Sequence, residues 1–251
     1  MLEVKRLSKT FGGVKAVQDV SFTIKEGTIH SVIGPNGAGK TTLFNLITGI
    51  YTPTEGEIVF KGENVAAKAP DELARRGMSR TFQNLQVCMN MSAIENVMAG
   101  AHLRLNQSMM LAMVRLPSLR RADKVCRDEA AGLMEFVGVG KYLKTHASQM
   151  PYGALKRLEI ARALAAKPKM LLLDEPAAGL NHTETAEIDA LIQKVADSGV
   201  TVVLVEHDMK LVMNLSDHIL VLDYGKKLAE GTAAEVRANP EVIAAYLGAS
   251  T

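Results

Sequence analysis

The chain has 251 residues, a formal net charge of +2 and 47% hydrophobic residues. This length fits one large domain, or one domain with a sizeable insertion, and the apolar content can fill a core. The near-neutral charge argues against nucleic acid as the main partner, no apolar run is long enough to span a membrane, and the two cysteines lack the spacing of a metal site or a disulfide framework, as expected for a reducing cytosol.

The first 83 residues are predicted to form strands and turns around one glycine-rich loop. Each predicted strand is an apolar run or alternates apolar with polar residues. The strands cover residues 2–7, a segment ending at Glu26-Gly27 with Val20, Phe22 and Ile24 on one face, residues 29–33 and residues 57–60. Because the first strand follows Met1 directly, we expect no signal peptide.

The glycine-rich loop is Gly34-Pro35-Asn36-Gly37-Ala38-Gly39-Lys40-Thr41, between the strand at 29–33 and a helix predicted at 40–49. This context separates a genuine phosphate-binding loop from a chance match. Its backbone N–H groups should form an anion nest at the positive end of the helix. Lys40 is predicted to reach the β- and γ-phosphates and Thr41 to offer its hydroxyl to Mg²⁺. The other predicted nucleotide-binding residues here are Asn36, Gly37, Ala38, Gly39 and Thr42.

Two later strands end in polar residues. An apolar run at 170–173 leads into Asp174-Glu175, and a second at 201–205 leads into Glu206-His207. Such pairs often only cap a helix, and a single histidine is usually a surface residue. Here they follow runs typical of strands buried in a parallel sheet, so we predict Asp174 as a metal partner, Glu175 as the base for the attacking water and His207 as a sensor of the γ-phosphate. The three segments together predict an ATPase that uses ATP and Mg²⁺.

The stretch from residue 84 to 150 has a helical pattern. It contains a capping box, Ser92-Ala93-Ile94-Glu95, and a helix predicted at 120–137. After Gly153 helices and strands alternate again, ending in a strand pair around Tyr224-Gly225-Lys226 and two short helices. We therefore predict one α/β domain spanning residues 1–251, with an antiparallel β subdomain, an α/β core (1–83 and 151–251) and an inserted all-helical subdomain (84–150).

These motifs, in this order, resemble the ATP-binding-cassette (ABC) transporter ATPases from about residue 2 to residue 247. The resemblance implies a P-loop NTPase fold and roles for further residues. Phe11 would stack on adenine with Val17 nearby, and Gln83, in Arg80-Thr81-Phe82-Gln83, would contact Mg²⁺ or the water. Tyr152 and Gly153 match the signature region, which in the family binds ATP held by a second subunit.

Finer details are similar to the first ATPase subunit of branched-chain amino acid importers. They lie at residues 11–17, 29–30, 43–49 and 177–181, in the Tyr-Gly form of the signature, and in an insertion around residues 101–121. This resemblance implies integral-membrane permease subunits and a second ABC ATPase as partners, a solute-binding protein as an indirect one, and a place on the cytoplasmic face of the inner or plasma membrane. A groove beside Gln83, lined by Leu85, Val87 and Met89, would receive a short permease helix, unless these residues are simply core.

The sequence departs from the family in its signature region. Pro151 stands where the family has a serine, so both a hydroxyl and an N–H donor are lost, and Ala154 replaces the usual glutamine. Proline is compatible with the first turn of a helix, so the fold should tolerate it.

Other functions remain open at this point. They are a related ABC system (urea or amide import, other amino acid import, or lipopolysaccharide export), a soluble ABC ATPase acting on DNA or ribosomes, and a nucleotide-binding signalling protein. The DNA and ribosome classes usually carry long coiled-coil insertions or two cassettes, which this chain lacks.

Overall fold

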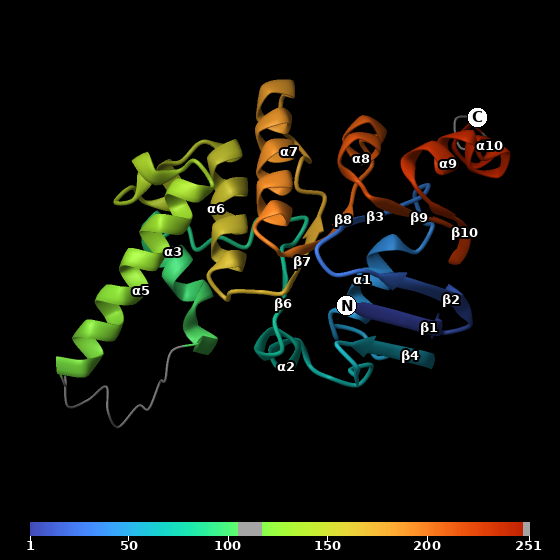
Figure 1. Ribbon diagram of the computed structural model, residues 1–251, viewed down its shortest axis with the longest axis horizontal. Helices are drawn as coiled ribbons and strands as arrows, with labels where there is room; N and C mark the ends of the chain where they lie inside the picture. Colours follow the sequence, from blue (N-terminus) through green and yellow to red (C-terminus); the bar gives the residue numbers. More distant parts are fainter. Residues whose placement is uncertain (105–116, 248–251) are drawn as a thin grey trace. The chain divides into compact units, whose positions relative to one another are not determined.

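The computed structural model describes residues 1–104 and 117–247 (Figure 1). It divides into two compact units. The first comprises Met1–Leu73, Leu172–Glu175 and the chain from Ile192 onward, and the second comprises Ala74–Leu171 and Pro176–Leu191. Residues 105–116 of the predicted insertion lie outside the described residues. Among the helices of the described ranges, none has the length and apolar character needed to cross a membrane.

The first unit contains an antiparallel sheet in the order β2-β1-β4-β5. Its strands are β1 (Leu2–Phe11), β2 (Val14–Ile24), β4 (Glu55–Phe60) and β5 (Glu63–Asn64). The predicted inward face of β2 is confirmed, since Val20, Phe22 and Ile24 are at most 5% exposed. Strand β1 extends to Phe11 rather than residue 7, because Phe11 pairs with Val14 across a tight turn.

The second sheet has the order β10-β9-β3-β8-β7-β6. Its strands are β3 (Ile29–Ile33), β6 (Met78–Arg80), β7 (Met170–Asp174), β8 (Thr201–Val205), β9 (His218–Asp223) and β10 (Lys226–Gly231). Strand β3 pairs in parallel with β8 and β9. Every residue of β3, β7 and β8 is buried, as the apolar runs predicted. In this order β7 lies between β8 and β6.

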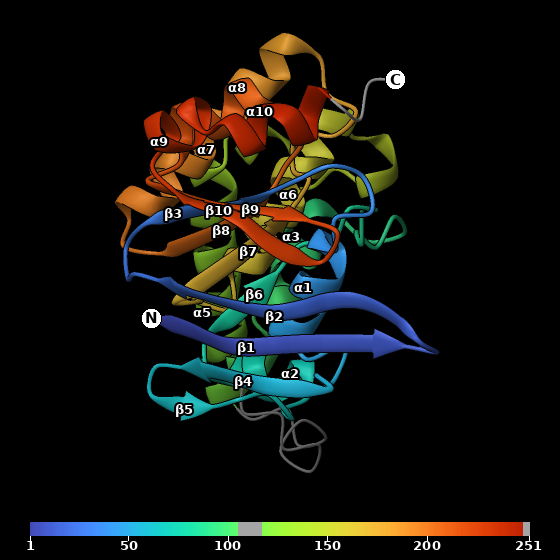
Figure 2. The same ribbon diagram turned by 90° about the vertical axis from the view of Figure 1, so that its right-hand side faces the viewer.

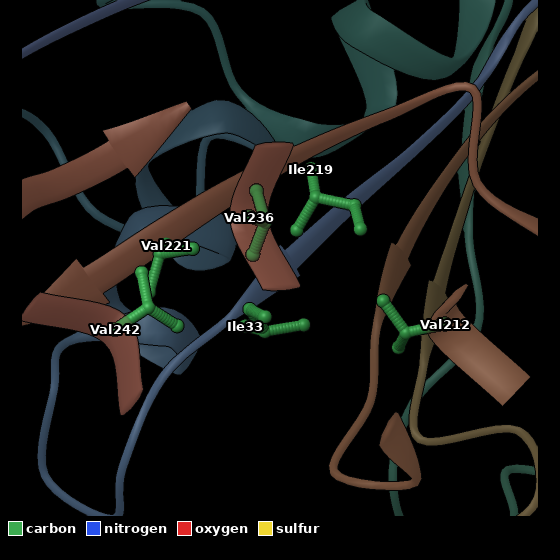
Figure 3. Close-up of a cluster of buried hydrophobic side chains, with 6 residues drawn as sticks. All are labelled: Ile33, Val212, Ile219, Val221, Val236 and Val242. Carbon is green, nitrogen blue, oxygen red and sulfur yellow. The ribbon is translucent and has the colours of Figure 1, made fainter. Parts of the chain in front are cut away.

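Four helices of the first unit flank these strands: α1 (Lys40–Ile47), α8 (Met209–Leu215), α9 (Ala233–Ala238) and α10 (Pro240–Leu247). Figures 1 and 2 both place α8, α9 and α10 on one side of β3, β9 and β10, and α1 on the side of the antiparallel sheet. Figure 3 shows a buried cluster that joins β3 and β9 to α8, α9 and α10: Ile33, Val212, Ile219, Val221, Val236 and Val242. Burying each such side chain contributes about 1.5–3 kcal/mol, so the cluster anchors the last two helices to the sheet.

The second unit is mainly helical. Helices α3 (Ala93–Gly100), α5 (Pro117–Phe136) and α6 (Tyr152–Leu164) pack on one another (Figure 1). The capping box is confirmed, because Glu95 accepts the Ser92 N–H at 2.8 Å. Short 3-10 turns lie at His102–Arg104, Gly140–Tyr142 and Ala147–Gln149. Helices α2 (Pro70–Arg75) and α7 (His182–Asp197) each have residues in both units.

Candidate functional site

The phosphate loop connects β3 to α1, as predicted. Gly34, Gly37 and Gly39 have φ angles of 153°, 79° and 97°, in a region that side chains rarely allow. A Cβ at Gly39 would lie 2.5 Å from the Ala16 carbonyl oxygen, so only glycine fits there. The Ala38 carbonyl accepts the Gly225 N–H at 3.0 Å. The turn between β9 and β10 therefore holds the phosphate loop in place through this hydrogen bond.

Lys40 is the buried cation of this loop. It is 7% exposed, and its Nζ donates to the carbonyl oxygens of Gly34 at 2.7 Å and Pro35 at 3.0 Å. Burial lowers the pKa of Lys40, while the Glu175 carboxylate acts in the opposite direction. Thr41 is exposed on the first turn of α1 and Thr42 is half-buried. The loop thus combines a fixed ammonium group with an accessible hydroxyl at a helix N-terminus, which suits a phosphate with its metal ion.

The acidic pair follows β7. Asp174 is 4% exposed at the end of the strand, and Glu175 has a positive φ of 48°. Such a conformation costs a non-glycine residue on the order of 1–3 kcal/mol and is found mainly at functional sites. A hydrogen bond from the Glu175 N–H to the Val205 carbonyl at 2.9 Å holds it in place.

Glu175 and His207 form a direct pair. Glu175 Oε1 lies 2.6 Å from His207 Nε2, and the two side chains are 12% and 48% exposed. Because β3 and β8 are parallel and in register, with Val32 opposite Val205, their carboxyl ends meet at one edge of the sheet, beside the end of β7. The structure thus brings together three predicted site residues that are far apart in the sequence: Lys40, Glu175 and His207.

Phe11 and Val17 differ in exposure. The Phe11 ring is 40% exposed and Val17 is 1% exposed. One edge contact joins Phe11 to Tyr51, with ring centroids 5.2 Å apart, and Lys9 Nζ lies 5.0 Å from the Phe11 centroid. Phe11 therefore presents exposed aromatic surface, whereas the Val17 side chain packs in the core.

The remaining predicted site residues lie in the second unit. Gln83 is exposed, Tyr152 is 44% exposed, and Gly153 is buried against Glu184, whose Oε1 would lie 2.5 Å from a Cβ there. The Tyr152 hydroxyl donates to the Ala178 carbonyl at 3.4 Å. The signature tyrosine thus contacts the segment before α7.

Pro151 and Asn181 occupy helix N-terminal positions. Pro151 precedes α6 with φ of −59°, and its carbonyl accepts the Leu155 N–H at 3.0 Å. The proline therefore fits the helix start as expected. Asn181 accepts the N–H groups of Thr183 and Glu184, both at 3.0 Å, and so caps α7.

The predicted groove beside Gln83 is only partly consistent with the structure. Val87 is 9% exposed and belongs to the core of its unit, so its assignment to a groove is wrong. Leu85 is half-buried and Met89 is 42% exposed. Apolar alternation in a loop does not tell which residues face the core, and tertiary packing decided it.

Comparisons with known proteins bear on this site. The profile of the family described as ABC transporter matches residues 17–178, and that of the branched-chain amino acid ATP-binding cassette transporter matches residues 226–250. The chain is an ABC transporter ATPase. It is 45% identical to the high-affinity branched-chain amino acid transport ATP-binding protein BraF of Pseudomonas aeruginosa, and 43% identical to LivG of Escherichia coli, in each case over 99% of this chain and 98% of the relative.

A solved structure has the same architecture. It is described as the ADP conformation of MJ1267, an ATP-binding cassette of an ABC transporter. It is 30% identical to this chain, with a TM-score of 0.85, over 99% of this chain and 98% of that one. The predicted fold class is confirmed.

Two residues that the sequence did not indicate contact the site of this ABC ATPase. Tyr246, on α10, is linked to Gly34 through a backbone hydrogen bond, and burial raises its pKa to about 12. The carboxylate of Glu206, 4% exposed, accepts the His207 N–H at 3.0 Å. Glu206 could have been noticed as a carboxylate at the end of a buried strand. Nothing in the sequence linked Tyr246 to the phosphate loop.

His30 gives the ATPase an expected acid sensitivity. It is 1% exposed on β3, its ring lies 5.8 Å from Phe22 and 5.2 Å from His218, and its Nε2 has no hydrogen-bond partner among the described residues. Burial first, and His218 second, lower its pKa from 6.5 to about 3. The unfolded chain therefore binds this proton at higher pH than the folded chain does. As the pH is lowered from 6.5 to about 3, we expect the free energy of unfolding to fall by at most about 1.4 kcal/mol per pH unit.

His30→Leu should keep the stability at pH 7, because it also removes an unsatisfied nitrogen, and should flatten the decline below pH 6.5. Urea unfolding at a series of pH values measures this, with the exposed His182→Gln as control. An unchanged pH profile in His30→Leu would show that other groups cause the decline.

Proposed function

We propose that this ABC ATPase powers a branched-chain amino acid importer by hydrolysing ATP at the edge where Lys40, Glu175 and His207 meet. The observation that carries the chemistry is the 2.6 Å pair between Glu175 and His207, at the same edge of the sheet as the phosphate loop. The similarity to BraF and LivG over nearly the whole chain supports the transported class.

Hydrolysis needs an oriented water and a group that takes its proton. In our proposal the water oxygen attacks the γ-phosphorus, Glu175 accepts the proton, and the bond to the bridging oxygen breaks to release ADP. The strained backbone of Glu175 and its contact with His207 fix the carboxylate before the reaction, which removes the cost of orienting it during the reaction. His207 keeps part of its ring exposed for the γ-phosphate.

We further propose Thr41 and Asp174 as the protein groups that hold Mg²⁺. Both offer oxygen, the donor that Mg²⁺ prefers, and this ion usually keeps several waters and phosphate oxygens beside one or two protein ligands. When bound, the ion would neutralise charge on the phosphates.

The other predicted site residues receive complementary roles. Phe11 would stack on adenine with its exposed ring, and the backbone at Val17, with Asn36, Gly37, Ala38, Gly39 and Thr42, would contact the rest of the nucleotide. Gln83 would sense Mg²⁺ or the attacking water. Tyr152 and Gly153 would contact ATP held by a second ATPase subunit.

The proposed assembly contains permease subunits and a second, different ATPase, and receives substrate from a solute-binding protein. Pro151 supports a heterodimer, because in a homodimer both ATP sites would lack the serine hydroxyl and the N–H. Each missing hydrogen bond to a charged group is worth about 1.5–3 kcal/mol. The proposed location is the cytoplasmic face of the membrane.

Met89 provides a test of permease docking. Met89→Glu places a charge on an exposed apolar side chain, and a buried unpaired charge at an interface is costly. We expect the variant to fold with stability within about 0.5 kcal/mol of the wild type and to lose about tenfold or more in affinity for the permease. Co-purification and transport measure this. Val125→Glu, which charges another exposed apolar residue of the same unit (53% exposed), is the control, and equal co-purification of both variants would exclude docking at Met89.

The transported class is tested by reconstituting the subunit with the permease, second ATPase and solute-binding protein encoded beside it. Uptake of labelled leucine, isoleucine and valine into proteoliposomes should depend on ATP. Each of the three amino acids should compete with the uptake of the others. ATP-dependent uptake of urea or another amino acid, without leucine uptake, would show that the transported substrate is a different one. The role of this chain as the ATPase would still hold. Absence of any coupled transport would overturn the importer proposal.

A further inference from the structure

Helix α6 presents three charged side chains to the segment that contains Gln83. Lys156, Glu159 and Arg162 are spaced three residues apart and therefore share one side of the helix. Lys156 is 3% exposed and Glu159 is 6% exposed, although such residues are rarely buried without partners. Both the segment and the helix belong to the second unit.

All three side chains bind the backbone of residues 82–86. Glu159 Oε1 accepts the N–H groups of Phe82 at 3.5 Å and Gln86 at 3.3 Å. Arg162 donates to the carbonyl of Gln86. Lys156 Nζ donates to the carbonyl of Gln83 itself at 3.2 Å.

These contacts give the segment the partners that it lacks in any helix or sheet. Residues 81–90 lie in no helix or strand, so secondary structure supplies no partners for their backbone N–H and C=O groups. Burial raises the pKa of Glu159, while the hydrogen bonds from Gln86 and Phe82 and the charges of Lys156 and Arg162 act to lower it. These contacts therefore stabilise the ionised form of the carboxylate. Because they go to the backbone, they set the position of the segment whatever its side chains are.

Lys156 also contacts the beginning of its own helix. Its Nζ lies 5.8 Å from the centroid of the Tyr152 ring, within the range of a cation–π contact. One buried ammonium group thus touches both the Gln83 backbone and the ring of the signature tyrosine.

We propose that Lys156 and Glu159 are positioning residues that make Gln83 and Tyr152 move together. When ATP held by a second subunit binds against Tyr152, the resulting movement would be transmitted to Gln83 through α6. This inference rests on the proposed roles of Gln83 and Tyr152 in ATP use. Neither Lys156 nor Glu159 needs to touch the nucleotide.

The local part of the proposal is tested by deuterium exchange on the isolated subunit. Glu159→Ala removes the shared acceptor, so the amides of Phe82 and Gln86 should exchange at least about tenfold faster. Glu159→Gln keeps an oxygen in the same place and should restore slow exchange. Arg157→Met is the matched control, since Arg157 lies on the same helix, pairs with Glu187 of α7 at 2.7 Å and, in the described part of the chain, makes no bond to this segment. Equal exchange of these two amides in Glu159→Ala and wild type would overturn the proposed positioning role of Glu159.

The functional part is tested in the assembled transporter. Lys156→Met should lower kcat for ATP by about 10–100-fold, because a misplacement of about 1 Å has effects of this size, while KM changes less than about threefold. Lys156→Arg should recover part of the activity, and Arg157→Met should stay within about twofold of the wild type. If Lys156→Met and Arg157→Met lower kcat equally, the positioning role is overturned even though the ATPase is intact. A wild-type assembly without coupled hydrolysis would instead contradict the proposed function.

Discussion

Replacing Glu175 by glutamine is expected to lower ATP hydrolysis by about 10²–10⁴-fold, the usual contribution of a general base, while ATP binding is retained. Glutamine keeps the shape of the side chain and an oxygen that can face His207 Nε2, which lies 2.6 Å from Glu175 Oε1 in the wild type. It cannot take a proton from water. Single-turnover hydrolysis by the assembled transporter measures the chemical step, and nucleotide titration measures binding.

Two further variants make this test specific. Lys40→Ala should weaken nucleotide binding itself, because it removes the ammonium group of the phosphate loop. Glu230→Gln alters another glutamate paired with a histidine, His218 at 3.3 Å, and should leave hydrolysis unchanged. Wild-type turnover by Glu175→Gln would show that another group activates the water.

The second large expected effect is an asymmetry between the two ATP sites of the proposed heterodimer. In the proposed heterodimer the two ATPases would close head to tail, so that each ATP would contact the phosphate loop of one subunit and the signature of the other. The site on this chain's loop has Lys40, Glu175 and His207 together with the partner's signature. The site that uses this chain's signature has Pro151, which offers neither hydroxyl nor N–H. We therefore expect Glu175→Gln to reduce transport by about 10²-fold or more, and the equivalent change in the partner to reduce it much less.

Pro151→Ser is the complementary variant. Pro151 is exposed at the helix start and makes its hydrogen bond through its carbonyl, so serine should fit without a large loss of stability. Serine is also a favoured N-cap residue. We expect ATP affinity at the weaker site to rise by about tenfold or more, as one regained hydrogen bond to a charged group allows. Equal damage from the two glutamate variants, with no gain in Pro151→Ser, would contradict the asymmetry.

The sequence by itself determined the local parts of the structure. The phosphate loop is contiguous, so its glycines, Lys40 and Thr41 reveal it without any tertiary information. The buried strands β3, β7 and β8 were visible as apolar runs, and the polar residues after them indicated the edge where the site forms. The capping box at Ser92 and the helical texture after Gln83 likewise depend on neighbours along the chain. The boundaries were less exact, as in β1, because pairing with β2 extends that strand to Phe11.

Only the tertiary structure decided which distant residues contact one another. The pair between Glu175 and His207 needs the end of β7 beside the end of β8, and the link from Tyr246 to Gly34 needs α10 packed against the sheet. The burial of Lys156 was not predictable either, since lysine on a helix normally faces water. Periodicity reports the faces of one element, whereas burial and hydrogen bonding depend on what packs against each face. For this reason the sequence indicated the chemistry of the site, and the fold alone revealed how its supporting residues are connected.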